Sequence, residues 1–146
     1  MNHNRPIPSP LPLTAMNTLC LRLVLPLFVA LPLAGWAEDV PLSKAYSQCM
    51  EQSGGVTAAM VECITAEYKR QDTRLNQAYK ALAKDLNAPR KKQLQEVQRA
   101  WLKFRDANCA FYDDPDGGTL ARVLSNECML TLTAQRAKEL ETLAQP

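Results

Sequence analysis

The chain has 146 residues and a formal net charge of +2 at pH 7, from 17 basic and 15 acidic side chains, which leaves room for one small domain. This balance provides neither a general positive field for nucleic acid nor a polybasic membrane anchor. The single histidine, His3, stands in the N-terminal segment, so the commonest general base and metal ligand is missing from the rest of the chain. We therefore expect neither an enzyme nor a bound metal or other cofactor.

The N-terminal segment has the layout of a secretory signal peptide. An apolar run over residues 23–34 follows Arg22 and ends at small residues before Ala37, which is the basic, apolar and small-residue order of such peptides. The run is short and interrupted by prolines, so it does not form a good membrane span. We expect residues 1–37 to be a signal peptide cleaved after Ala37, leaving a single domain over residues 38–146 in the periplasm or outside the cell.

Two further features of this segment concern its start and its anchoring. Residues 1–15 contain four prolines and make an unusual leader, whereas a start at Met16 gives a compact signal peptide. We therefore expect residues 1–15 to be an over-called start. Cys20 precedes the apolar run, while a lipid-modified cysteine would follow it, so we expect no membrane anchor on the mature protein.

Four cysteines follow the expected cleavage point: Cys49, Cys63, Cys109 and Cys128. An even number of cysteines in a small exported domain predicts two disulfides. No two of these cysteines have the Cys-x-x-Cys spacing that is typical of zinc sites. We therefore expect them to be held in disulfides, where they cannot act as nucleophiles.

Apolar residues recur at helical spacing along most of the remaining chain. A short helix is expected over residues 42–52, where a serine and two glycines end it. A long helix follows over 58–86 with Thr57 as its N-cap, a third begins at a proline and covers 89–112, and the last covers 119–143. No alternation is long enough to predict a sheet. The predicted class is all-α, a small antiparallel hairpin or bundle of three to four helices stapled by two disulfides.

The spacing of the large apolar residues predicts which helix faces are buried. On the long helix, Glu67 falls on the polar face and Gln71 fills one position of the apolar face. On the third helix, Trp101 and Phe104 belong to an apolar stripe, so we expect them in the core rather than as binding anchors. The expected core positions of the third and fourth helices are Leu94, Val97, Trp101, Phe104, Phe111, Leu120, Leu124, Cys128, Leu132 and Leu140.

An antiparallel pairing of the long helix with the third helix predicts a disulfide pattern. If this hairpin turns near residue 86, Tyr68 faces Phe104 and Cys63 faces Cys109. This register favours Cys63–Cys109, and leaves Cys49–Cys128 to join the first helix to the last. The local pattern, Cys49–Cys63 with Cys109–Cys128, is geometrically possible too and stays open.

Arg105 and Asp106 adjoin the apolar stripe of the third helix. Neighbouring residues in a helix do not face each other, so we do not expect this dipeptide to form an internal ion pair. We expect Arg105 to pair with a carboxylate on another helix, such as Glu127 or Glu62.

The ordered cysteines and the sequence between them resemble the LprI-type domain, a family named for a lysozyme inhibitor. The resemblance covers nearly all of the expected mature chain. Its founding member is a lipoprotein, and this chain departs from it because it has no lipobox. The resemblance implies a small exported helical domain and a lysozyme-inhibitor function. It is carried by Cys49, Met60-x-x-Cys63, Trp101-x-x-Phe104-Arg105-Asp106-x-x-Cys109, Gly117-Gly118-Thr119, Glu127-Cys128 and Leu132-Thr133-x-x-Arg136-x-x-x-Leu140.

Two charged turns are the candidate partner-binding sites. The acidic turn contains Asp113, Asp114 and Asp116; it lacks the ligand register of a calcium loop, but its carboxylates would attract a basic partner such as lysozyme. The basic tip contains Arg90 and the two lysines that follow it, Lys91 and Lys92, and could plug a lysozyme cleft, which is built around two carboxylates.

These observations predict an exported protein-binding domain, with lysozyme as the partner that the resemblance implies. The alternative prediction is a periplasmic adaptor, stress or immunity-type protein that binds a partner other than lysozyme. Inhibition of lysozyme by the purified protein distinguishes the two.

Overall fold

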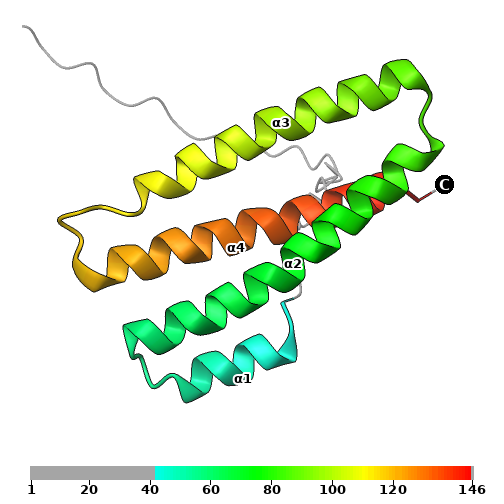
Figure 1. Ribbon diagram of the computed structural model, residues 1–146. Coiled ribbons are helices and arrows are strands. Elements are labelled where there is room, and N and C mark those ends of the chain that lie inside the picture. The colour runs from blue at the N-terminus through cyan, green and yellow to red at the C-terminus, as the bar shows by residue number, and fades with distance from the viewer. Residues whose placement is uncertain (1–41, 146) are drawn as a thin grey trace, which may run out of the picture. The chain divides into compact units, whose positions relative to one another are not determined.

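The computed structural model describes residues 42–145, which belong to one structural unit and contain four α-helices and no strand. Figure 1 shows the helices in chain order. They are α1 (Lys44–Gln52), α2 (Thr57–Asp85), α3 (Ala88–Phe111) and α4 (Gly118–Leu143). The all-α prediction is confirmed, and the helix limits agree with the predicted ones within two residues. The predicted signal peptide, its leader and the cleavage point after Ala37 lie outside the described residues.

Local capping explains where the helices begin and end. Ser43 caps α1, because its Oγ accepts a hydrogen bond from the Tyr46 N–H at 3.1 Å. Asn87 caps α3 in the same way through the Arg90 N–H at 3.1 Å, and each bond satisfies a backbone donor that the first helical turn leaves free. The predicted N-cap of α2 is wrong by one position. Thr57 is the first residue of the helix, and the N-cap is Val56, whose side chain makes no capping hydrogen bond.

The core of the unit lies between α2 and α4, which run in the same direction along each other (Figure 1). Alanines on both helices, such as Ala78 and Ala137, allow their backbones to approach closely, and Leu140 is fully buried beside them. A second cluster, built on Ile64 and Leu130, is covered by side chains of α1. Helix α1 is therefore held against α2 at one end of this pair.

The packing of α3 differs from the prediction. We expected α3 to pair with α2, but the extensive helix contacts join α2 to α4, α1 to α2 and α3 to α4. Only part of the predicted stripe points inward: Leu94 and Trp101 reach the core between α2 and α4. Val97, Phe104 and Phe111 are 54%, 55% and 86% exposed, so their predicted place in the core is wrong. The same holds for two residues of α4, Leu120 and Leu124.

The inward face of α3 is instead largely polar. Its buried residues are Gln98, Arg105 and Cys109, which lie at helical spacing with Leu94 and Trp101. The long side chains of Gln98 and Arg105 bridge from α3 to α4 and α2, so the α3 backbone does not come close to α2.

Both disulfides join helices that are neighbours in the chain. Cys49–Cys63 links α1 to α2 with a Cα–Cα distance of 5.7 Å, and Cys109–Cys128 links α3 to α4 at 5.4 Å. The favoured long-range pattern is therefore wrong, and the local pattern that stayed open is the one observed. The predicted register does not occur, because α3 packs along α4 and not along α2.

Candidate partner-binding surfaces

Two guanidinium groups lie over the ring of Trp101. The Cζ atoms of Arg105 and Arg136 lie 5.2 Å and 5.9 Å from the Trp101 ring centre, within the range of cation–π attraction. The Arg136 Nε donates to the Gln98 side chain at 3.1 Å, and one Arg105 nitrogen donates to the Thr133 hydroxyl at 3.3 Å. These contacts tie α3 to α4, so this part of the Trp-x-x-Phe-Arg-Asp motif has a structural role.

The partner of Arg105 is not the one we predicted. Arg105 is only 7% exposed, and its Nε and Nη2 donate to the Asp106 carboxylate at 2.9 and 2.8 Å. An arginine side chain is long enough to turn back along the helix surface to a neighbouring carboxylate, which the argument from helix faces overlooked. Of the two predicted partners, Glu127 accepts from the Tyr46 hydroxyl, and Glu62 is exposed on α2.

Glu67 is the other polar position that the sequence misplaced. It is fully buried and accepts four hydrogen bonds: from the Ser43 N–H (3.0 Å), the Ser43 Oγ (2.6 Å), the Arg70 Nε (2.7 Å) and the Gln71 Nε2 (2.8 Å). Burial alone would raise the pKa of this carboxyl, but the donors outweigh it and lower the pKa from 4.5 to about 2. Glu67 therefore fixes the start of α1 against α2 as a buried carboxylate.

A second contact from α1 reaches α4. The Tyr46 hydroxyl donates to Glu127, and burial together with this hydrogen bond raises the pKa of Tyr46 above its ordinary value. The hydroxyl therefore stays protonated and serves as a donor. Glu67 and Tyr46 therefore both serve to hold α1 against the other helices.

The predicted acidic turn joins α3 to α4 and is fully exposed. The Asp114 carboxylate accepts from the Asp116 N–H at 2.9 Å, and the Asp114 carbonyl accepts from the Gly117 N–H at 3.0 Å. Gly118 has a φ of 64°, in the left-handed region that favours glycine, and a Cβ on Gly117 would lie 2.8 Å from that of Ala121. The two glycines of the motif therefore shape this turn.

Large apolar side chains flank the acidic turn on both helices. At the end of α3, Phe111 is 86% exposed and packs edge-on against Tyr112 at 6.2 Å between ring centres. At the start of α4, Leu120 and Leu124 are exposed, and Leu124 lines a shallow depression together with Tyr112. We call this surface the acidic–aromatic end; it comprises Phe111, Tyr112, Asp113, Asp114, Asp116, Leu120 and Leu124. The sequence did not predict that the aromatic residues and leucines belong to this surface, because their spacing also fits an apolar stripe in the core.

The predicted basic tip lies at the other end of α3. Arg90, Lys91 and Lys92 are exposed in its first turns, and the Arg90 Nη1 donates to the Gln93 side chain at 2.8 Å. Because α3 has 24 residues, at about 1.5 Å of rise per residue it is about 36 Å long. The basic tip and the acidic–aromatic end are therefore separate surfaces.

Among residues 42–145 there is no cluster of three or more His, Cys, Asp or Glu side chains arranged to hold a metal ion. None of the helices in this range is long and apolar enough to cross a membrane.

Four helices, two local disulfides and a cation–π layer around one tryptophan define a small disulfide-stapled helical domain. The family comparison then gives its membership: residues 49–140 match the family described as "Lysozyme inhibitor LprI", and the chain belongs to that family. It is also similar to an uncharacterized protein of Rhizobium meliloti (strain 1021), with 27% identity over 95 residues that cover 56% of this chain and 68% of that protein. No solved structure matches the chain.

Proposed function

We propose that this chain is an exported protein-binding domain that inhibits lysozyme by covering the substrate cleft of the enzyme. Membership of the lysozyme-inhibitor family over residues 49–140 supports this function. The absence of histidine beyond His3 and the engagement of all four described cysteines in disulfides are consistent with a protein that binds rather than catalyses.

The acidic–aromatic end is the surface that we assign to this contact. The observation that carries the assignment is the 86% exposure of Phe111 directly beside three carboxylates, none of which has an ion-pair partner among the described residues. Aromatic side chains that become buried supply much of the energy of protein interfaces. The carboxylates attract a basic enzyme and orient it during approach.

The basic tip is the competing surface for the same function. Its lysines would approach the pair of carboxylates in a lysozyme cleft, but they expose no aromatic side chain next to them. The two surfaces are at opposite ends of α3, so substitutions at one leave the other intact. Variants at the two ends therefore distinguish between them.

The test is lysozyme turnover of a cell-wall substrate with increasing amounts of the oxidised protein, over a series of salt concentrations. We expect inhibition that weakens as salt rises, because screening reduces the attraction between exposed charges. Phe111→Ser and the triple change of Asp113, Asp114 and Asp116 to Asn should each weaken inhibition about tenfold or more, the range expected for removing a central anchor. The matched control is Lys91→Gln with Lys92→Gln, which should leave inhibition unchanged.

The opposite pattern, in which only the lysine control loses inhibition, would move the contact to the basic tip. If the oxidised protein leaves lysozyme turnover unchanged at large molar excess, the inhibitor function is refuted. A pull-down from the cell envelope would then identify the partner of an adaptor, stress or immunity-type protein, with Phe111→Ser as the control bait.

A further inference from the structure

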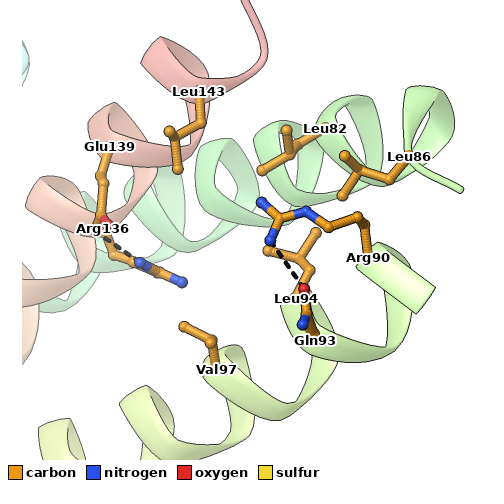
Figure 2. Close-up of a pocket in the computed structure, with 9 residues that line it drawn as sticks. All are labelled: Leu82, Leu86, Arg90, Gln93, Leu94, Val97, Arg136, Glu139 and Leu143. Atoms are coloured by element: carbon orange, nitrogen blue, oxygen red, sulfur yellow. Dashed lines mark hydrogen bonds and ion pairs between the residues drawn. The ribbon is translucent and has the colours of Figure 1, made fainter.

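A cavity of about 280 Å³ opens between the end of α2, the beginning of α3 and the end of α4. Figure 2 shows the side chains that line it. The aliphatic ones are Leu82 from α2, Leu86 directly after α2, Leu94 and Val97 from α3, and Leu143 from α4. The cavity is separate from the acidic–aromatic end.

This cavity exists because α3 is held away from α2. Two side chains at its wall, Val97 and Leu143, are 54% and 59% exposed, although a closer approach of the helices would bury them. The space between the helices is bridged further along α3 by Trp101 and Arg105 instead of being closed. A concave, mostly apolar site of this kind is typical of small-molecule binding.

The charges that line the cavity leave one cation without a carboxylate partner. Arg136 is paired with Glu139 at 2.7 Å, so their charges offset each other. Arg90 has no carboxylate within ion-pair distance among residues 42–145. Its Nη1 donates to the Gln93 Oε1 at 2.8 Å, and Figure 2 shows its guanidinium reaching from α3 toward Leu82 at the end of α2 and Leu86 directly after it.

This contact positions donors at the mouth of an apolar cavity. The Gln93 oxygen accepts from the Arg90 Nη1, and the other N–H groups of the guanidinium can donate to a ligand. A planar carboxylate can accept from two guanidinium N–H groups at once. An acyl chain attached to that carboxylate would lie along the leucines and remove their surface from water.

We propose that this cavity binds a single-chain fatty acid, with its carboxylate on Arg90 and its acyl chain between Leu82, Leu94 and Val97. The volume favours a single chain, because ligand cavities in proteins span roughly 300–1,000 Å³ and this one, at about 280 Å³, is just below that range. This activity is independent of lysozyme inhibition, which we place at the other end of α3.

The test is calorimetric titration of the oxidised protein with sodium decanoate, below the concentration at which decanoate forms micelles. We expect saturable binding of one decanoate per chain. Arg90→Gln should weaken it about tenfold or more, the loss expected for a hydrogen bond to a charged group. Lys92→Gln, which removes the same charge from an exposed position outside the cavity, should leave the affinity unchanged.

Two further arms separate the contributions of the chain and the head group. Decanol should bind more weakly than decanoate and with the same affinity to wild type and Arg90→Gln. Val97→Asp places a carboxylate in the cavity wall and should abolish decanoate binding. Phe104→Asp, an equally exposed position one heptad further along α3, should not affect it, and circular dichroism checks that both variants fold.

Three results would overturn the proposal. The first is that decanoate shows no saturable binding. This includes the outcome in which the cavity is instead a contact between two copies of the protein, so that the protein self-associates and Val97→Asp abolishes the self-association. The second is equal affinity of wild type and Arg90→Gln for decanoate. The third is much tighter binding of decyl phosphate, which would assign the cavity to a phosphate-headed amphiphile.

Discussion

Glu67→Gln tests whether a buried carboxylate holds the first helix in place. All four groups that contact Glu67 donate hydrogen bonds to it, whereas a glutamine there has one acceptor oxygen and presents an NH₂ to the remaining donors. The pKa of Glu67 falls from 4.5 to about 2 in the folded protein. At about 1.4 kcal/mol per pKa unit, this difference corresponds to about 3 kcal/mol of stability.

The sign of the pH dependence follows from the lowered pKa. Between about pH 2 and 4.5 the unfolded chain binds a proton at Glu67 that the folded chain does not, so the free energy of unfolding rises with pH. The stabilisation is fully present above pH 4.5 and is lost as the pH falls toward 2. We therefore expect Glu67→Gln to cost about 3 kcal/mol at pH 7 and to cost little near pH 2.

Urea unfolding followed by circular dichroism, repeated at several pH values between 2 and 7, measures this difference. Glu62→Gln is the matched control, because Glu62 is an exposed carboxylate on the same helix; its curve should run parallel to that of wild type. The prediction is refuted if the free energies of unfolding of Glu67→Gln and wild type, plotted against pH, run parallel over the whole range. The donors around Glu67 would then not stabilise its charge.

Two other predictions concern stability. Replacing Cys109 and Cys128 together by serine opens a loop with a sequence separation of 19 and should lower the free energy of unfolding by about 3 kcal/mol, measured by urea unfolding; an unchanged midpoint would contradict this. Leu130 is fully buried, so Leu130→Ala should cost about 2–5 kcal/mol, whereas Leu120→Ala, at a position 59% exposed, should change stability by less than about 0.5 kcal/mol; similar thermal midpoints for the two variants would contradict the burial pattern.

The class of fold and the helix limits could be predicted because they depend on local signals. Pro89 favours the start of α3, and the glycine pair after Ser53 favours the end of α1. Both effects are local and do not depend on the tertiary packing. The helix ends shifted by only one or two residues for this reason. The number of disulfides was predictable as well, since it follows from composition and the expected compartment.

The disulfide pattern could not be predicted because it depends on which helices pack together. A short turn makes α2 and α3 neighbours in the chain, and this favoured a hairpin. Helix α4, however, brings Ala137 into one buried cluster with Ala78 of α2, and small residues on both helices allow a closer approach than the aromatic side chains of α3. With α2 paired to α4, Cys63 has α1 as its neighbour and bonds to Cys49.

The inward face of α3 was misassigned for a related reason. Hydropathy alone places Val97 and Phe104 inside and Gln98 and Arg105 outside. In the structure the Arg105 guanidinium donates hydrogen bonds to Thr133 and Asp106 and lies over the Trp101 ring. These contacts compensate for the loss of water and allow its burial. The contact with Thr133 depends on where α4 packs and is not visible in a local pattern. The contacts with Trp101 and Asp106 lie within α3, but an argument from hydropathy and helix faces does not predict them.

The burial of polar residues on the inward face of α3 has a direct consequence for where partners can bind. Because polar residues occupy much of the inward face of α3, Val97, Phe104 and Phe111, at a spacing of seven residues, stay largely exposed along one side of the helix. The first of them lines the cavity that we assign to a fatty acid, and the last belongs to the acidic–aromatic end. Both proposed sites thus follow from one structural cause, the polar layer that holds α3 away from α2.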